Sequence, residues 1–394
     1  MPKKRRPPLG CAMIVMYSSY FMALTPREQA KRDKLKNEKP LVYEKILKIP
    51  ERHSAGIATP IIDIAYSYQC NLSCDHCTAW RGRWMRGPKA RKLTPTDLLN
   101  LSNQAHDLGL AQFCISGGEP TTFHDIDEVI TALQPDKFHI AMSTHGHFLT
   151  LDKAKHYKGL GLDKVKISLD DFDPKLHEAN RNSEGSYQKA IDAMFNAKEA
   201  GLSVVIQTVV TRHTAQTDRI KKMAQFATEN DFTVDILCAR PTGAWEGRYD
   251  MLINEDDEAF LWAAKQEYPV LHRDTWPAYG MQKGSGAVHS TLHVTQYGDI
   301  MPCVYIHIGI GNLFTGSLRD AIDLGNQISW FRRHNKLCLS SEDRDFITNY
   351  IAKAYDKQLP IPWTEAFSSG DMVDPSSYSD LKTRYEEQQA LSPN

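Results

Sequence analysis

Residues 61–77 of the chain read IIDIAYSYQCNLSCDHC. The first half is an apolar, β-rich run that predicts a buried strand. Directly after it, Cys70, Cys74 and Cys77 form a C-x3-C-x2-C loop. Three thiolates can hold three irons of a four-iron, four-sulfur cluster and leave the fourth iron open to another ligand. Structural zinc prefers four ligands, and His76 is poorly spaced to complete that set, so zinc is the weaker interpretation.

Five more apolar runs follow, with helical stretches between them. Thr94-Pro95 predicts a helix N-cap with proline at the first helical position, Ser186 opens a second helix that Gly201 ends, and Thr214 is expected to cap a third. Alternating strands and helices predict a parallel sheet with right-handed crossovers. Six such units suit a partial (β/α)6 barrel of the α/β class, with its chemistry at the C-terminal ends of the strands. The predicted strands are Ile61–Ser67, Gln112–Ser116, Phe138–Ser143, Lys164–Leu169, Val204–Val210 and Thr233–Cys238.

The composition is that of an ordinary globular protein. The 394 residues include 47 basic and 48 acidic ones, for a net charge of −1, and this balance argues against nucleic-acid binding. The apolar run from Cys11 to Leu24 is shorter than the ~20 residues that span a bilayer, so we expect an unstructured leader and no stable membrane insertion. A membrane-surface anchor and an export signal are the alternatives for this basic and then apolar start. Eight cysteines are too few for a disulfide scaffold of this length. A three-thiol iron site needs a reducing compartment, so the cytoplasm is expected.

Polar turns follow the next strands of the predicted barrel. The second strand runs into Ser116-Gly117-Gly118-Glu119-Pro120. Its glycines would let backbone approach a ligand, and Glu119 offers an acceptor to an ammonium group, although the same residues also suit a plain turn. The third strand ends in Ser143-Thr144-His145-Gly146 and the fourth in Ser168-Leu169-Asp170-Asp171. We expect these turns to meet the cysteine loop at one end of the barrel.

Residues from about 60 to 285 resemble the radical SAM superfamily, on the cysteine loop and the GGEP turn together. In that family the open iron binds the amino and carboxylate groups of S-adenosylmethionine (SAM). One electron then splits a carbon–sulfur bond, giving methionine and a 5′-deoxyadenosyl radical that takes a hydrogen atom from the substrate. The resemblance implies one open-site 4Fe-4S cluster on Cys70, Cys74 and Cys77. It also implies an external electron donor of the flavodoxin or ferredoxin type.

The same resemblance implies the SAM contacts. The GGEP motif binds the methionine ammonium in the family, and Thr144 matches a turn that reaches ribose or methionine, or is simply hydrogen-bonded. His76 stands where an aromatic residue packs near the adenine. Arg181 lies in a segment resembling H-x3-R-x3-G-S-[FY] and suits the methionine carboxylate, with a plain surface charge as the alternative. The implied cofactor-binding residues are His76, Gly117, Gly118, Glu119, Pro120, Thr144, Ser168 and Arg181.

After the barrel, the stretch Tyr297–Cys303 resembles the opening of a SPASM or twitch extension, which usually carries further iron–sulfur clusters. The full pattern has seven cysteines, whereas this segment supplies Cys303 and Cys338, with Cys238 as a distant third. We therefore expect the extension without its clusters. A second cluster with a histidine ligand stays open, and those histidines otherwise belong to the exposed face of alternating strands. They are His289, His293 and His307.

Cys238 ends the sixth predicted strand, where its thiol would face the substrate. It is a candidate catalytic residue that returns a hydrogen atom to a product radical, with a small buried hydrophobe as the alternative.

The sequence thus predicts an enzyme that abstracts a hydrogen atom from a small molecule, or a peptide, in natural-product or cofactor biosynthesis. Dehydrogenation, epimerisation, rearrangement and bond formation all stay open as reaction types. A ribosomal-peptide maturase is one alternative. A non-catalytic iron–sulfur electron-transfer protein is another, but it leaves the GGEP turn unexplained. The predicted divisions are a leader and N-terminal extension (1–59), the barrel (60–285), a small α+β extension (286–367) and a polar tail (368–394).

Overall fold

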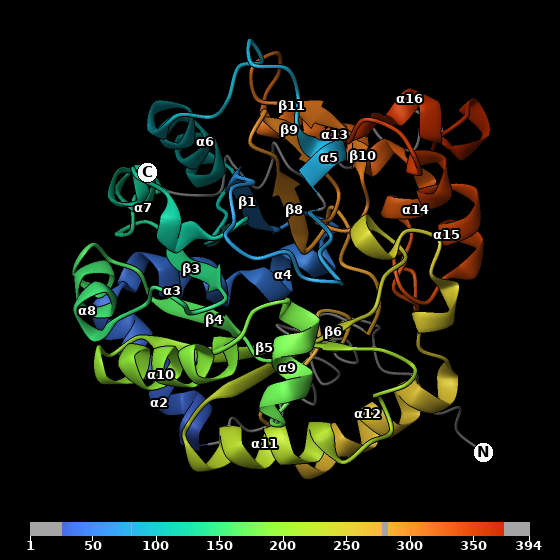
Figure 1. Cartoon of the computed structure of the whole chain (residues 1–394). Helices are drawn as coiled ribbons and strands as arrows, with labels where there is room; N and C mark the ends of the chain where they lie inside the picture. Colours follow the sequence, from blue (N-terminus) through green and yellow to red (C-terminus); the bar gives the residue numbers. More distant parts are fainter. Residues whose placement is uncertain (1–25, 80, 278–282, 374–394) are drawn as a thin grey trace, which may run out of the picture.

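The computed structural model describes residues 26–79, 81–277 and 283–373, and a ten-stranded sheet runs through its centre (Figure 1). All six predicted strands are present, with bounds within about one residue of those expected. Each pairs in parallel with the next along the chain, which confirms the α/β class. They are β1 (Ile61–Ser67), β2 (Gln112–Gly117), β3 (His139–Thr144), β4 (Lys164–Ser168), β5 (Ser203–Val210) and β6 (Thr233–Cys238).

Short strands extend both edges of this parallel core. β7 (Leu271–His272) pairs in parallel with β6, and β8 (Thr291–Val294) pairs in parallel with β1. Antiparallel strands β9 (Asp299–Met301) and β11 (Gly311–Asn312) follow outside β8. The order is therefore β11-β9-β8-β1-β2-β3-β4-β5-β6-β7. The added strands have two to four residues each, too few for hydrophobic periodicity to reveal them. A separate two-stranded sheet joins β10 (Ile308–Gly309) to β12 (Ile361–Pro362).

The predicted helix signals work in two of three cases. Thr94 caps α6 (Pro95–Asp107) in a full capping box with Asp97, and α10 (Ser186–Glu199) begins and ends where expected. The third prediction is wrong, because α11 (Arg219–Glu229) has Asp218 at its N-cap rather than Thr214. The Thr214 hydroxyl instead accepts from the backbone N–H of Thr211, which uses the side chain in a turn before the helix.

Helices cover the outside of the sheet, and in the part of the chain that the structure describes three of them lie before β1. Between the first two of these helices, Lys39 donates to the carbonyls of Phe138 and Gly161, just before β3 and β4. The N-terminal helices therefore sit at the strand ends opposite the predicted chemistry. The remaining α-helices are α2 (Pro26–Glu38), α3 (Pro40–Leu47), α4 (Ile49–Ser54), α5 (Arg81–Trp84), α7 (Ile126–Ala132), α8 (Leu151–Gly159), α9 (Pro174–Arg181), α12 (Glu255–Glu267), α13 (Leu318–Gln327), α14 (Ser329–Arg332), α15 (Arg344–Asn349) and α16 (Trp363–Ala366). Short 3-10 turns are η1 (Pro120–Thr122), η2 (Gly243–Trp245), η3 (Tyr249–Met251), η4 (Ile351–Ala354) and η5 (Ser369–Asp371).

Strand residues alternate between an apolar layer under the helices and a polar interior. On β1, Ile62 and Ile64 are fully buried in the hydrophobic core, whereas Asp63 and Ala65 face an internal cavity. On β5, Gln207 lines that cavity, and the neighbouring Thr208 hydroxyl reaches the Asp170 carbonyl at 3.5 Å. The inward-facing polar residues therefore line a cavity at the ends of the strands instead of filling the interior of the barrel with apolar side chains.

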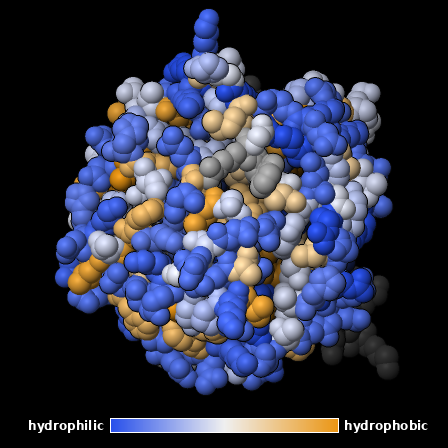
Figure 2. All heavy atoms as spheres, viewed as in Figure 1, coloured by the Kyte–Doolittle hydropathy of each residue, from blue (hydrophilic) through white to orange (hydrophobic). Residues whose placement is uncertain are grey.

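The C-terminal part of the chain, orange to red in Figure 1, lies beside the β8 edge of the sheet. Gly298, at φ 75°, turns the chain between the antiparallel strands β8 and β9. Hydrophilic residues cover most of the face in Figure 2, and hydrophobic ones gather only in small groups. Within residues 26–373, gaps apart, no helix combines the length and apolarity needed to cross a membrane. The expectations for the first 25 residues and for the tail beyond 373 lie outside the described residues.

Candidate active site

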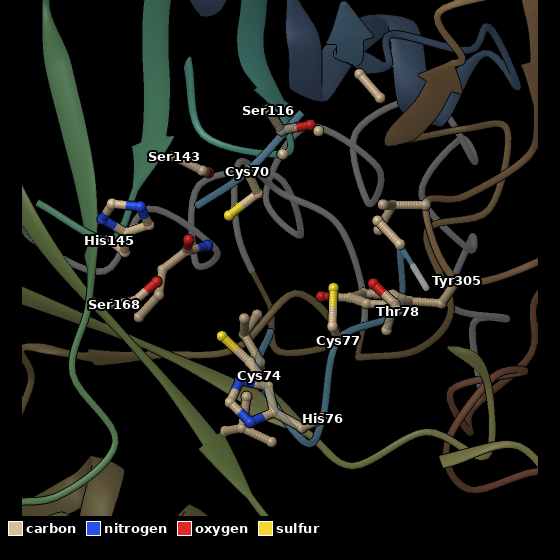
Figure 3. Close-up of a pocket in the computed structure, with 18 of the residues that line it drawn as sticks. Cys70, Cys74, His76, Cys77, Thr78, Ser116, Ser143, His145, Ser168 and Tyr305 are labelled. Atoms are coloured by element: carbon tan, nitrogen blue, oxygen red, sulfur yellow. The ribbon is translucent and has the colours of Figure 1, made fainter. Parts of the chain in front are cut away.

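A cavity of about 280 Å³ opens at the C-terminal ends of the barrel strands (Figure 3). It is lined by the cysteine loop, by the turns after β2, β3 and β4, by the end of β6, and by Val304, Tyr305 and His307 of the C-terminal part. Pro120 is buried but is absent from the lining, where it begins η1. The predicted site residues that line the cavity are Cys70, Cys74, His76, Cys77, Gly117, Gly118, Glu119, Thr144, Ser168, Arg181 and Cys238.

The turn after β2 holds the beginning of the cysteine loop. Backbone N–H groups of Gly118 and Glu119 donate to the carbonyls of Ser67 and Gln69 at 2.8 and 2.7 Å. A Cβ on Gly118 would stand 1.8 Å from the Gln69 oxygen, so only glycine allows the two segments to lie this close. Glycine is therefore required at position 118 because this turn packs against the backbone of the cysteine loop. Contact of the same glycines with SAM stays a prediction.

The far side of the loop is held by the turn after α9. Asn182, in the left-handed conformation at φ 50°, donates its amide to the Ser73 carbonyl at 2.8 Å and to the Asp75 carboxylate at 2.6 Å. At the end of the loop, the Ala244 N–H donates to the Cys77 carbonyl at 3.0 Å. These bonds come from elements far apart in sequence and fix the backbone between the cysteines.

The three thiol side chains point into one common space (Figure 3). Among the described residues, no three His, Cys, Asp or Glu side chains converge closely enough to hold a single metal ion. Thiolates on a four-iron cluster bind different irons, so they surround the cluster rather than meet at a point. This arrangement is compatible with a cluster, and the assignment of the three thiols to it stays a prediction. Burial raises the pKa of the Cys77 thiol to about 11, so iron would have to displace its proton on binding.

Glu119 is almost fully buried and accepts hydrogen bonds at both carboxylate oxygens. Its Oε1 accepts from the hydroxyls of Thr121 and Thr144 at 2.5 Å each, and Oε2 accepts from the His145 N–H at 2.9 Å. Burial raises the pKa of Glu119, and these donors oppose that rise. The Thr144 hydroxyl is thus hydrogen-bonded within the protein, to Glu119, as one of the two expectations for this residue stated. The network holds the carboxylate in one orientation at the cavity wall.

Arg181 forms a buried, two-pronged ion pair with Asp170. Its Nε and Nη2 donate to the two carboxylate oxygens at 2.8 and 3.0 Å, and Nη1 lies 3.9 Å from the Cys74 sulfur. Burial alone would raise the pKa of Asp170, but the arginine charge lowers it to about 2. The surface-charge alternative for Arg181 is therefore wrong. Only the Nη1 side of the guanidinium remains directed at the cluster loop and available to a ligand.

His76 shares its part of the cavity with Trp245, which sequence reasoning did not single out. The two ring centroids are 5.8 Å apart, and both side chains line the cavity. Burial lowers the pKa of His76 to about 4, so the ring is neutral near pH 7. A neutral imidazole beside an indole offers flat surfaces suited to a heteroaromatic ring. Nothing in the spacing around Trp245 indicates this, because η2 folds against the cysteine loop only in three dimensions.

The three remaining candidate cysteines for a second cluster lie around a buried arginine. Arg240 donates to the Cys238 carbonyl at 2.8 Å and to the Ser340 hydroxyl at 3.1 Å, and it stacks 3.5 Å from the centre of the Tyr305 ring. Its charge also acts on the thiols of Cys238 and Cys303. Arg240 thus packs among these residues, and the absence of a second cluster stays a prediction.

Iron counting tests this arrangement. We expect close to four irons per chain after anaerobic reconstitution, because the first cluster uses the loop cysteines and Arg240 fills the space near the others. The measurement is colorimetric iron and sulfide analysis of the wild type and of the Cys303→Ala/Cys338→Ala variant. About eight irons in the wild type, falling to about four in the variant, would contradict it.

The fold and the three-thiol cavity define an α/β barrel enzyme built to hold an iron–sulfur cluster together with a second ligand. The model of the radical SAM superfamily matches residues 64–227. Residues 64–227 of the chain therefore match a radical SAM domain, and the enzymes of that superfamily use a 4Fe-4S cluster and SAM.

Several known proteins are similar to the chain. The AdoMet-dependent heme synthase of Nitratidesulfovibrio vulgaris is 23% identical over 273 residues, which is 62% of this chain and 73% of that protein. Mycofactocin maturase MftC of Mycolicibacterium smegmatis is 28% identical over 272 residues, 66% of this chain and 68% of that protein. The structure of Streptococcus suis SuiB bound to S-adenosylmethionine superimposes with a TM-score of 0.54 at 18% identity, over 78% of this chain and 74% of that one. SuiB bound to precursor peptide SuiA gives 0.53 at 17% identity, over 69% and 66%.

Glu119→Gln should weaken SAM binding while leaving the cluster in place. The variant keeps the size of the side chain and removes the charge that would meet the methionine ammonium. Loss of one charge-assisted hydrogen bond corresponds to about tenfold or more in Kd. Binding is measured by calorimetry on reconstituted protein, with Glu246→Gln as the matched control, because Glu246 is paired with Arg83 and neither residue lines the cavity. An unchanged Kd would remove Glu119 from the SAM site.

Proposed function

We propose that the chain abstracts a hydrogen atom from a small-molecule or peptide substrate in natural-product or cofactor biosynthesis. The observation that carries this proposal is the joining of the cysteine loop to the Glu119 turn by backbone hydrogen bonds within one cavity. Cluster site and SAM site are then parts of one rigid unit. We further propose that the enzyme works in the cytoplasm with a flavodoxin or ferredoxin as electron donor.

Each residue has a proposed task within that unit. Cys70, Cys74 and Cys77 would hold the cluster, which when bound supplies the electron for reductive cleavage of SAM. Glu119 would hold the methionine ammonium, while the Arg181 Nη1 group would receive its carboxylate. Smaller contacts along the wall would come from Gly117, Gly118, Thr144 and Ser168, with His76 beside the adenine.

Cys238 is proposed as the residue that returns a hydrogen atom to the product radical. It ends β6, lines the cavity and is 2% exposed. Burial raises the pKa of its thiol to about 12, so it keeps its S–H hydrogen near pH 7. A protonated, sheltered thiol facing the substrate space supports the role of hydrogen donor. The proposal favours epimerisation among the reaction types.

Reductive cleavage of SAM in the absence of substrate tests the proposed function. Anaerobically reconstituted protein with dithionite and SAM should form 5′-deoxyadenosine, measured by chromatography. Cys114→Ala should behave as the wild type, because that buried thiol on β2 does not line the cavity. Protein that carries the cluster and yet forms no 5′-deoxyadenosine would contradict the proposal.

A ribosomal-peptide maturase is the second candidate. Its support is the similarity in fold to SuiB bound to a precursor peptide, and the similarity in sequence to a mycofactocin maturase. Genes for short peptides beside the gene of this chain, and mass changes in such a peptide after reaction with the enzyme, would favour this candidate over a small-molecule substrate.

A further inference from the structure

Two buried histidines of the C-terminal part face the cavity and have no task in SAM binding. His293, on β8, and His307 are each 3% exposed. Both side chains line the cavity. The expectation that they belong to an exposed strand face is wrong, because β8 joins the sheet beside β1 and turns His293 inward. His289, in contrast, is half-buried and is absent from the lining of the cavity.

The ring of His293 is oriented by a carboxylate. Its Nδ1 lies 2.7 Å from the Asp63 Oδ1, which also accepts from the Ser116 hydroxyl at 2.5 Å. A carboxylate that already accepts one hydrogen bond orients the imidazole with its Nδ1–H toward it. The other nitrogen, Nε2, is then a hydrogen-bond acceptor. Among the described residues no partner is found for this Nε2.

His307 is oriented in the same sense. The Val304 carbonyl favours the protonated form of the ring and so an N–H on its side, and Nε2 is buried without a partner in the described chain. The ring also meets Trp84 edge-on, with centroids 4.8 Å apart. A buried acceptor without a donor is unfavourable unless a ligand supplies one. Both imidazoles therefore present an unused acceptor to one cavity.

These acceptors lie away from the proposed SAM contacts. Figure 3 places Tyr305, two residues before His307, on the opposite side of the view from His145 and Ser168, with the cysteines between them. Tyr305 and His307 come from the C-terminal part, whereas every proposed SAM contact comes from the barrel. The wall formed by the two histidines thus faces the space that SAM leaves to a substrate.

We propose that His293 and His307 bind the substrate through their Nε2 atoms, and that the substrate presents hydroxyl or amino groups to them. The proposal rests on the proposed function and names its substrate class. A sugar or cyclitol offers such donors, and so does a serine or lysine side chain of a peptide. A carboxylate or a purely apolar group would leave both acceptors unpaired. Asp63 acts as a positioning residue, since it selects which nitrogen of His293 accepts.

Probe binding to the cluster-loaded, SAM-bound enzyme tests the proposal, by saturation-transfer NMR. The probes are myo-inositol, D-glucosamine, and the pair acetyl-Gly-Ser-Gly-amide and acetyl-Gly-Ala-Gly-amide. We expect binding of hydroxyl or amino probes, weakened about three- to tenfold in His307→Phe, which keeps a ring against Trp84 but has no acceptor. His289→Phe is the matched control and should bind as the wild type.

A second variant tests the orientation of His293. In Asp63→Asn the new amide can donate to Nδ1, which would place the imidazole proton on Nε2. The D-glucosamine ammonium, which can only donate, should then bind more weakly than myo-inositol, whose hydroxyls can also accept. A merely structural role of Asp63 would weaken both probes alike.

The outcomes separate this inference from the proposed function. Binding of the cyclic probes alone supports a small-molecule substrate, and preference for the serine peptide over its alanine counterpart supports a peptide. If no hydroxyl or amino probe binds, or if His307→Phe binds them unchanged, the inference is wrong even where 5′-deoxyadenosine forms normally. Failure of SAM cleavage with retained, His307-dependent probe binding would overturn the proposed function and leave this site standing.

Discussion

Replacing Cys70, Cys74 and Cys77 together with alanine is expected to give colourless protein that forms no 5′-deoxyadenosine. The three thiols come from one loop and line the cavity together with Glu119 and Arg181. Without thiolates the cluster has no anchor, and SAM then receives no electron. The visible absorbance of the reconstituted protein and the yield of 5′-deoxyadenosine are measured side by side.

The same variant should still fold. The cysteine side chains are partly exposed, and the loop is held through its backbone by the turns after β2 and α9. Far-ultraviolet circular dichroism should therefore match that of the wild type prepared without iron. Cys114→Ala again serves as control and should keep both colour and activity. A triple variant that retained the cluster absorbance would show that other residues hold the iron.

Arg181→Ala is expected to lower the free energy of unfolding by about 3–5 kcal/mol, because it leaves Asp170 charged, buried and unpaired. Asp170→Asn combined with Arg181→Ala should recover part of this loss, since the neutral amide costs less to bury. Urea denaturation of the protein without iron, followed by tryptophan fluorescence, measures both. Arg248→Ala breaks an exposed arginine–aspartate pair and should leave the midpoint almost unchanged.

The sign of the pH dependence follows from the same pair. The pKa of Asp170 falls from its ordinary 3.8 to about 2 in the folded chain. Its contribution to stability is therefore complete above about pH 4 and is lost as the pH falls through about 2. If Arg181→Ala cost no more than Arg248→Ala at neutral pH, Arg181 would not be needed to neutralise Asp170. Weak SAM binding by a stable Arg181→Lys variant would then report on its contact with the ligand alone.

Much of the fold was predictable because its signals are local. Each barrel strand is a continuous apolar run, and each reappears within about one residue of its expected bounds. Thr94 marks a helix start through bonds made within one turn, and Ser186 is the first residue of α10 although its side chain makes no capping bond. The edge strands escaped prediction, since β7 has two residues and β8 only four. Thr214 misled because a threonine that caps a turn has the same local sequence as one that caps a helix.

The sequence alone determined the cysteine loop, its place after the first strand and the GGEP turn after the second, because these depend on residue type and short spacing. Tertiary structure alone decided how the polar residues are paired. Arg181 is bound to Asp170, and His293 reaches Asp63 across 230 positions of the chain. Which buried donor meets which acceptor depends on strand order and register, and these are set by the packing of the whole sheet rather than by any local pattern.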